Sequence, residues 1–274
     1  MSETKQLAIV LTFTIFIGLI GFFLAQSVPS IFMEGDVVVD EYHATIYLNG
    51  TFVEDYLYDV RKSDKFRMLY RHWSAPVSVT KLTQPYIEVL SIEPPEGAVG
   101  YTKDYSGKVL ASSYVNEIGS LAELNEIGCF NPYRFKAGKY RIRYVFKLHP
   151  PVEYDSNLCH LNLKLADEHL PYLKVTVDVE DNGLIKEIYP HPQSLTVIRG
   201  STTAVLGRSH KNELLEVEML LKLDVLNMLD GFTRYVENVE SMTSQANFFS
   251  ATQYFLIDAL RNVVKVLILA APLI

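Results

Sequence analysis

The sequence predicts a mainly β fold: a β-sandwich ectodomain, one large or two tandem immunoglobulin-like domains, between an N-terminal transmembrane helix and a C-terminal helical or membrane segment. Three observations predict it. Residues 7–25 form a run of nineteen residues without a charge. Between residues 37 and 223, short runs alternate apolar and polar residues and are separated by turn residues, which is typical of sandwich strands. Beyond residue 223 the apolar period becomes that of a helix.

These observations divide the chain into four parts. Residues 1–27 are a membrane anchor or signal, 28–223 the extracytoplasmic β-sandwich domain, 224–262 a helical linker, and 263–274 the start of a second transmembrane span. A helix over residues 7–25 would be about 28 Å long, close to the ~30 Å of a bilayer's hydrocarbon core. Its length favours a retained anchor, although Ala25-Gln26-Ser27 is an acceptable cleavage tripeptide and leaves cleavage as the alternative.

Charge indicates the orientation and excludes one class of partner. Lys5 precedes the apolar run and acidic residues follow it, so the positive-inside rule places the β domain on the extracytoplasmic side of the cell membrane. A net charge of −7 argues against nucleic acid as a partner. Outside the membrane, Cys129 and Cys159 are able to form a disulfide, and two buried thiols are the alternative.

The clearest hairpin joins Val37–Leu48 to Thr51–Val60. The Asn49-Gly50 pair between these runs predicts a two-residue type I′ turn, in which both residues have positive φ. Asn49-Gly50-Thr51 is also a glycosylation sequon, which is the alternative interpretation of the same residues.

The cleanest alternation lies in Lys139–Leu148, where apolar side chains share one face and lysines and arginines the other. We expect acidic residues of neighbouring strands to oppose the cationic face, either Asp178 and Glu180 or Glu216 and Glu218. No helix is expected between residues 37 and 223. The other strands are expected at Val77–Leu82, Tyr86–Ile92, Lys108–Val115, Cys159–Leu165, Leu173–Val179, Leu184–Tyr189, Ser194–Ile198, Thr203–Leu206 and Leu214–Leu223.

The C-terminal part follows a helical stripe that includes Phe249, Leu256 and Leu260. From Val263 to Ile274 only one residue is charged, and twelve residues are too few to cross a bilayer. We therefore expect the chain to be the front part of a longer membrane protein.

A basic and aromatic stretch is the candidate binding surface. It comprises Arg67, Tyr70, Arg71 and Trp73, the last being the only tryptophan. Cations interleaved with aromatic rings suit an anionic ligand or lipid headgroups. The alternative is structural: a solvated loop in which Trp73 fills the core and Arg71 pairs with an acidic residue of the preceding strand, Glu54 or Asp55.

Signatures of catalysis are absent from the sequence. It contains no nucleophile elbow, phosphate-binding loop, dinucleotide-binding glycines or HExxH motif. A metal-dependent hydrolase is the enzymatic alternative, because imidazoles and carboxylates are ligands that zinc favours. The spacings match no ligand signature, so no metal site or cofactor is predicted. The residues of this alternative are His149, His160, His169 and His191, with Asp155, Asp167 and Glu168 near them in sequence.

Five further motifs are Asn125-Glu126-Ile127-Gly128, Phe135-Lys136-Ala137-Gly138-Lys139-Tyr140, His149-Pro150-Pro151, His160-Leu161-Asn162-Leu163-Lys164-Leu165-Ala166 and Tyr189-Pro190-His191-Pro192. Together they resemble the archaeal branch of the YciQ-like predicted membrane proteins. The resemblance extends from Glu41 to Ile274. It implies an external N-terminal β domain followed by transmembrane helices and a cytoplasmic tail, and it implies no activity.

The sequence favours a membrane-anchored extracytoplasmic module that binds or organises something at the cell envelope, without catalysis of its own. Membrane lipid is the first expected partner, and an envelope glycan or another membrane protein the next. The competing functions are the metal-dependent hydrolase and a sensor or transport accessory that acts through membrane segments beyond Ile274.

Overall fold

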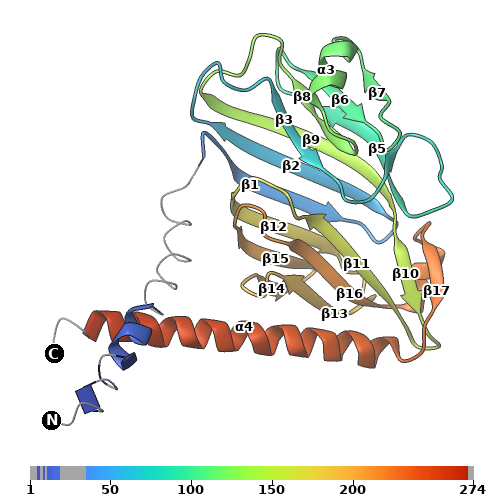
Figure 1. Cartoon of the computed structure of the whole chain (residues 1–274). Coiled ribbons are helices and arrows are strands. Elements are labelled where there is room, and N and C mark those ends of the chain that lie inside the picture. The colour runs from blue at the N-terminus through green and yellow to red at the C-terminus, as the bar shows by residue number, and fades with distance from the viewer. Residues whose placement is uncertain (1–4, 7–8, 10, 19–34, 271–274) are drawn as a thin grey trace. The chain divides into compact units, whose positions relative to one another are not determined.

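The computed structural model describes residues 5–6, 9, 11–18 and 35–270 (Figure 1). Residues Gly35–Asn247 form one compact unit that contains all the sheets, and the remaining described residues belong to a second unit. No helix within the described ranges combines the length and hydropathy needed to cross a bilayer. The span expected at residues 7–25 and the one expected at residues 263–274 both extend outside the described residues.

Strands dominate the compact unit, so the predicted mainly β class is confirmed. Helix α3 (Val115–Leu121), the 3₁₀ helix η1 (Leu223–Asn227) and helix α4 (Val239–Ala270) accompany them. The strands are β1 (Val37–Ile46), β2 (Thr51–Val60), β3 (Met68–His72), β4 (Val77–Ser78), β5 (Tyr86–Glu93), β6 (Val99–Lys103), β7 (Val109–Ala111), β8 (Glu126–Phe130), β9 (Gly138–His149), β10 (Pro151–Tyr154), β11 (Leu158–Ala166), β12 (Tyr172–Glu180), β13 (Ile185–His191), β14 (Thr196–Arg199), β15 (Thr202–Ser209), β16 (Leu215–Lys222) and β17 (Phe232–Tyr235).

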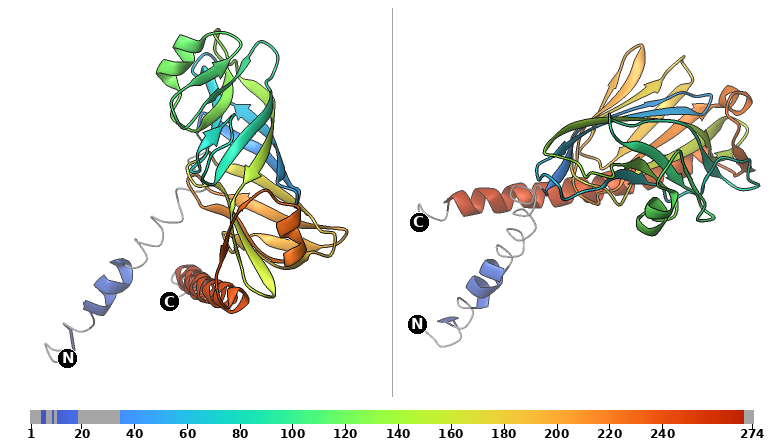
Figure 2. Two further views of the ribbon diagram at one scale, coloured as in Figure 1. Left: turned by 90° about the vertical axis from the view of Figure 1, so that its right-hand side faces the viewer. Right: turned by 90° about the horizontal axis from the view of Figure 1, so that it is seen from above.

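These strands form three sheets. The largest has the order β14-β15-β12-β1-β2-β9-β5-β4, the second β13-β16-β11-β10-β17 and the third β3-β8-β6-β7. Figure 2 shows the second and third sheets at different ends of the compact unit. The pairs β1–β12, β4–β5 and β10–β17 are parallel. This mixed topology differs from the two antiparallel sheets of an immunoglobulin-like sandwich.

The hairpin of β1 and β2 is confirmed, but the predicted type I′ turn is wrong. Only Gly50 of the Asn49-Gly50 pair has positive φ, 91°. The backbone N–H of Gly50 donates to Tyr47 O, and that of Tyr47 donates to Thr51 O, both at 2.9 Å. The loop therefore has three residues and ends on a left-handed glycine, which is the arrangement of a G1-bulge hairpin.

The predicted facing of β9 is confirmed, whereas the predicted partners of its cationic face are wrong. Ile142, Tyr144 and Phe146 are fully buried. β9 lies between β2 and β5, so Arg143 is opposite Asp55 and Glu93 rather than opposite residues of β12 or β16. Its Nη1 lies 3.7 Å from Asp55 Oδ2. Strand order, which is set by pairings far apart in sequence, decides these partners.

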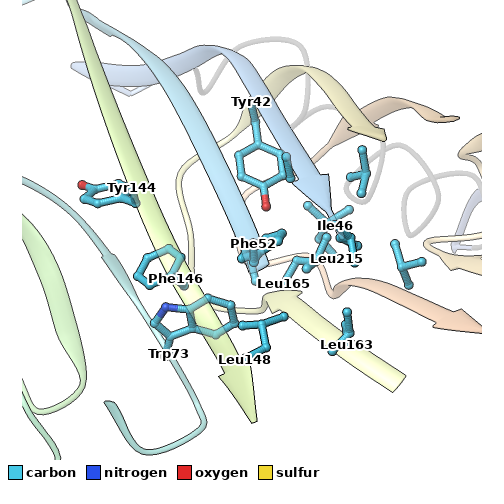
Figure 3. Close-up of a cluster of buried hydrophobic side chains, with 14 of the residues drawn as sticks. Tyr42, Ile46, Phe52, Trp73, Tyr144, Phe146, Leu148, Leu163, Leu165 and Leu215 are labelled. Atoms are coloured by element: carbon cyan, nitrogen blue, oxygen red, sulfur yellow. The ribbon is translucent and has the colours of Figure 1, made fainter. Parts of the chain in front are cut away.

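All three sheets contribute to one hydrophobic core. In Figure 3, Trp73 lies beside Phe146 and Leu148, and its ring meets that of Phe146 edge-on with centroids 5.5 Å apart. Cys129 and Cys159 are both buried and free, so they are two buried thiols and not a disulfide. Burial raises the pKa of Cys129 to about 12 and that of Cys159 to about 11.

Several elements were not expected from the sequence, including strands β6, β8 and β10, where no strand was predicted. Helix α3 interrupts a region predicted to be free of helices, and only one of its residues, Ile118, is buried. β3 occupies the stretch that was expected to be a binding surface or, in the alternative, a solvated loop. β17 lies in the segment predicted as a helical linker, ahead of the helix that the stripe did predict, α4.

Candidate functional site

β3 separates the four predicted binding residues into two pairs. Arg67, just before the strand, and Tyr70 are exposed, while Arg71 and Trp73 are buried. The alternation of a strand explains the division, because Leu69 and Arg71 point into the core and their neighbours point away. Arg67 donates through Nη2 to Pro132 O at 3.3 Å. The binding role of the four residues stays a prediction, and two of them have no access to a membrane surface.

Arg71 forms a buried ion pair with Glu54, one of the two structural partners considered from the sequence. Its Nη1 lies 2.7 and 2.8 Å from the two carboxylate oxygens of Glu54, and its Nη2 donates to Leu165 O. The guanidinium also lies 3.3 Å from the centroid of the Trp73 ring. Burial opposes the charge of Arg71, but the Glu54 carboxylate outweighs it, and the pKa of Arg71 is raised.

Two tyrosines also contact Glu54. Tyr42 and Tyr56 donate their hydroxyls to its Oε1 at 2.7 and 3.3 Å. The side chain of Glu54 has no exposed area. Both carboxylate oxygens therefore have a donor, but burial outweighs Arg71 and the tyrosines and raises the pKa of Glu54.

A cavity of about 390 Å³ lies beside this ion pair. Tyr58, Phe66 and Tyr172 contribute aromatic surface to it, and Arg71 is part of its wall. Its size falls within the range of small-molecule sites, about 300–1,000 Å³. The remaining lining residues are Val37, Val39, Met68, Leu69, Tyr70, His72, Glu123, Ala166, Glu168, His169, Leu170, Lys211 and Asn212.

Two buried polar atoms of residues that line the cavity have no hydrogen-bond partner among the described residues: Arg71 Nε and His72 Nδ1. A buried polar atom left unpaired costs about 1–3 kcal/mol, so such atoms usually have a partner. The lining has no excess of positive charge, because Arg71 is neutralised by Glu54 and Lys211 accompanies two carboxylates, Glu123 and Glu168. The cavity therefore offers hydrogen bonding without a net cationic charge.

The four histidines of the enzymatic alternative do not form one site. His149 contacts Glu88 and Asp230, and the two ring nitrogens of His169 lie 2.5 and 2.7 Å from the carbonyl oxygens of Leu170 and Glu213. Only His160 and His191 share a partner, Glu218. Within the described part of the chain, no group of three or more His, Cys, Asp and Glu side chains is arranged to hold a metal ion.

Residues 39–221 match a family model that is described as "Predicted membrane protein (DUF2207) N-terminal domain". The chain belongs to the DUF2207 family. This result agrees with the resemblance to predicted membrane proteins of unknown function. The matched range of the DUF2207 domain contains Glu54, Arg71 and most of the cavity lining. No curated protein matches the chain significantly.

Among solved structures, the DUF2207 chain is similar to an M1 zinc metallopeptidase from Deinococcus radiodurans, with 10% identity and a TM-score of 0.36 over 67% of this chain and 42% of that one. It is also similar to Legionella pneumophila aminopeptidase A in complex with aspartic acid, with 9% identity and a TM-score of 0.38 over 69% of this chain and 22% of that one. The chain thus spans less than half the length of these proteins. Scores of this size do not establish a shared fold.

Sequence reasoning named Glu54 of the DUF2207 domain only as one of two possible partners of Arg71, and it missed Tyr172 and His169. Glu54 could have been preferred to Asp55, because it stands on the buried face of β2 between Phe52 and Tyr56. A single carboxylate within an apolar face indicates a buried charge with a partner. Tyr172 and His169 had no such signal, since they reach the cavity through the pairing of β1 with β12.

Proposed function

We propose that this chain is an extracytoplasmic ligand-binding module of a membrane protein, anchored at the cell membrane by its N-terminal apolar run and without catalysis of its own. The observation that supports it best is the cavity beside Arg71, where aromatic rings and polar side chains form one lining. Two of the lining residues, Arg71 and His72, also have a buried polar atom with no partner among the described residues. Membership of the archaeal branch and a sandwich-like arrangement of the sheets belong to this proposal.

The ligand we propose is an uncharged saccharide, such as a segment of envelope glycan. A sugar ring has C–H groups on its faces and hydroxyls around its edge, so it suits aromatic walls combined with polar groups that donate and accept. Tyr58, Phe66 and Tyr172 supply the aromatic surface, and Glu168 and Asn212 supply polar groups. The lack of a positive excess in the lining favours a neutral ligand over a phosphate or carboxylate.

Lipid headgroups are less well supported than they were by sequence alone. Arg71 already neutralises Glu54, and Trp73 is only 4% exposed. Arg67 and Tyr70 remain as the accessible members of the predicted surface. We therefore place Tyr70, which lines the cavity, in the saccharide site and assign Arg67 no contact with the ligand.

Tryptophan fluorescence tests the binding. Trp73 is the only tryptophan and stacks on Arg71, so its emission reports events at the cavity. We expect neutral mono- and disaccharides to change this emission saturably in the whole chain, and Tyr70→Ala to weaken the effect at least tenfold. Tyr133→Ala is the matched control, because Tyr133 is 83% exposed and lies outside the cavity lining. Saturation by glucuronate or anionic vesicles in place of neutral sugars would refute the proposed ligand.

Thiol labelling of intact cells tests the side of the membrane. Both native cysteines are buried, so the unmodified chain is the unlabelled background. Glu96→Cys lies at an exposed turn and should react with an impermeant thiol reagent before lysis. Ser2→Cys, on the predicted cytoplasmic side, should react only afterwards. The reverse order of reaction would place the domain in the cytoplasm.

A further inference from the structure

Three contacts attach the first residues of helix α4 to the sheet that contains β13, β16 and β11. The backbone N–H of Val239 donates to Asp155 Oδ2 at 3.0 Å. Ser244 Oγ lies 3.2 Å from Tyr189 OH on β13. Asn247 donates through Nδ2 to Glu218 Oε2 on β16 at 2.6 Å, and it is 4% exposed. The third of these contacts differs from the others because its acceptor is shared with two histidines.

Glu218 is the centre of this cluster. Its Oε1 lies 2.7 Å from His160 Nε2 on β11, and its Oε2 lies 3.6 Å from His191 Nε2 on β13. The side chains of Glu218, His160 and His191 are 12%, 15% and 18% exposed. One carboxylate thus connects three strands to the helix, and both imidazoles carry their positive charge only when protonated.

We propose that His160, His191 and Glu218, together with Asn247, form a proton-dependent clamp that holds the third turn of α4 against the sheet and releases it as the pH rises. The clamp is independent of the proposed ligand site, because none of its residues lines the cavity. It regulates how firmly the β domain holds the helix that leads to the predicted second membrane span.

The other charged groups around the clamp come from every neighbouring element. Glu216 Oε1 on β16 lies 4.0 Å from His191, and Glu153 Oε2 on β10 lies 3.5 Å from His160. Arg234 on β17 pairs with Glu153 through the other carboxylate oxygen. On α4, Glu240 pairs with Lys186 of β13 at 2.6 Å and so is already neutralised. Carboxylates therefore outnumber cations around the two imidazoles, which favours their protonated forms.

The direction of the pH effect follows from these contacts. Burial opposes protonation of His160, but its hydrogen bond to Glu218 and the charges of Glu218 and Glu153 outweigh burial and raise its pKa. The hydrogen bond to Glu218 raises the pKa of His191 against burial. Burial of Glu218 is outweighed by the same histidines and Asn247, which lower its pKa to about 2.

The helix itself supplies Asn247, which raises the pKa of His191 and lowers that of Glu218. Release of the helix removes these contributions, so protonation of His191 favours the docked helix, and this preference is lost as pH rises through the docked pKa of His191. The effect on Glu218 changes only below its ordinary pKa of 4.5, toward pH 2. The clamp is thus closed near pH 5–6 and loosens on the alkaline side.

The clamp lies at the point along α4 where the compact unit ends. The compact unit that contains the sheets ends at Asn247, the residue that Glu218 holds. Helix α4 continues without interruption to Ala270. The Val239 contact to Asp155 does not involve a histidine, so the first turn stays attached when the third is released.

Protection of a cysteine at position 243 tests the proposal. Thr243 is 5% exposed, and its carbonyl oxygen accepts from Asn247 Nδ2 at 3.0 Å. Release of the third turn therefore also moves this preceding turn from the sheet and makes Thr243→Cys accessible to a thiol reagent. In the whole chain in detergent, its labelling rate is divided at each pH by that of the exposed Glu96→Cys, which removes the effect of thiol ionisation. We expect protection to fall between pH 5.5 and 8.5, by about tenfold for each pKa unit of imidazole shift.

Variants distinguish the clamp from a general loosening. In the Thr243→Cys background, Glu218→Gln and the pair His160→Gln/His191→Gln should show weak protection that no longer depends on pH in this range. His43→Gln is the matched control, because His43 forms a similar pair with Asp178 at 2.8 Å on the largest sheet. Protection that stays constant from pH 5.5 to 8.5, or that changes equally in wild type and the histidine variants, would overturn the proposal. Far-ultraviolet circular dichroism of each variant shows that it has folded.

Discussion

Arg71 offers the sharpest test of how the core of this domain is built. Replacing it with methionine keeps most of the side-chain volume and removes the charge, which leaves the Glu54 carboxylate buried without its cation. Breaking a buried ion pair in this way typically costs about 3–5 kcal/mol. The loss of the contact with Trp73 adds to this, since a desolvated cation–π pair is worth about 2 kcal/mol or more.

The companion variant is Glu54→Gln/Arg71→Met. Glutamine keeps an oxygen that accepts the hydroxyls of Tyr42 and Tyr56, yet it has no charge to leave uncompensated. We therefore expect the double variant to lose about 2–3 kcal/mol less unfolding free energy than the two single variants lose in sum. This coupling is near the upper end of those measured between residues in contact.

Urea unfolding of the whole chain followed by far-ultraviolet circular dichroism measures these free energies, because Trp73 emission would respond to the loss of Arg71 itself. Arg67→Met is the matched control: the same substitution at an exposed arginine should cost less than about 1 kcal/mol. If Arg71→Met lowers the free energy of unfolding no more than Arg67→Met does, the buried pair does not stabilise the fold. Arg71 would then again be a candidate for ligand binding at the surface.

Two further predictions concern packing. Gly128→Ala should destabilise by about 1–3 kcal/mol because the new Cβ would lie 2.6 Å from Leu69 O, whereas Gly119→Ala in α3 meets only ordinary contacts and should stabilise by up to about 1 kcal/mol; thermal melts of both variants check the difference in sign. Tyr144→Ala should cost about 3–5 kcal/mol while Tyr144→Phe costs nothing, because the buried Tyr144 hydroxyl has no partner among the described residues, and a loss in the phenylalanine variant would reveal an unseen hydrogen bond.

Strands with one buried face were predictable from sequence, and those buried on both faces were not. β9, β11 and β16 alternate because one face meets the core and the other is polar. All five residues of β8 are buried, so its sequence has no alternation to detect. Helix α3 was not predicted for a related reason: a seven-residue helix with a single buried side chain has no periodic apolar stripe.

The candidate site was predictable only in part. Tyr70 and Arg71 were found because cations and aromatic residues are close together in sequence, and both line the cavity. The choice between a ligand and Glu54 as the partner of Arg71 depended on how β2 and β3 approach each other, which no local pattern encodes. His160 and His191 lie on different strands and meet only because β16 is between β11 and β13.

The parallel pairing of β1 with β12 has a consequence for biosynthesis. β1 is complete by Ile46, and its partner on this side begins at Tyr172, more than a hundred residues later. At the usual speed of synthesis of about 5–20 residues per second, on the order of ten seconds pass before that partner exists. During this interval one edge of β1 exposes unpaired backbone groups, a hazard that folded proteins avoid. A nascent chain of this kind needs its first hairpin shielded until most of the domain has emerged, and truncation before β12 should yield aggregates rather than a smaller folded domain.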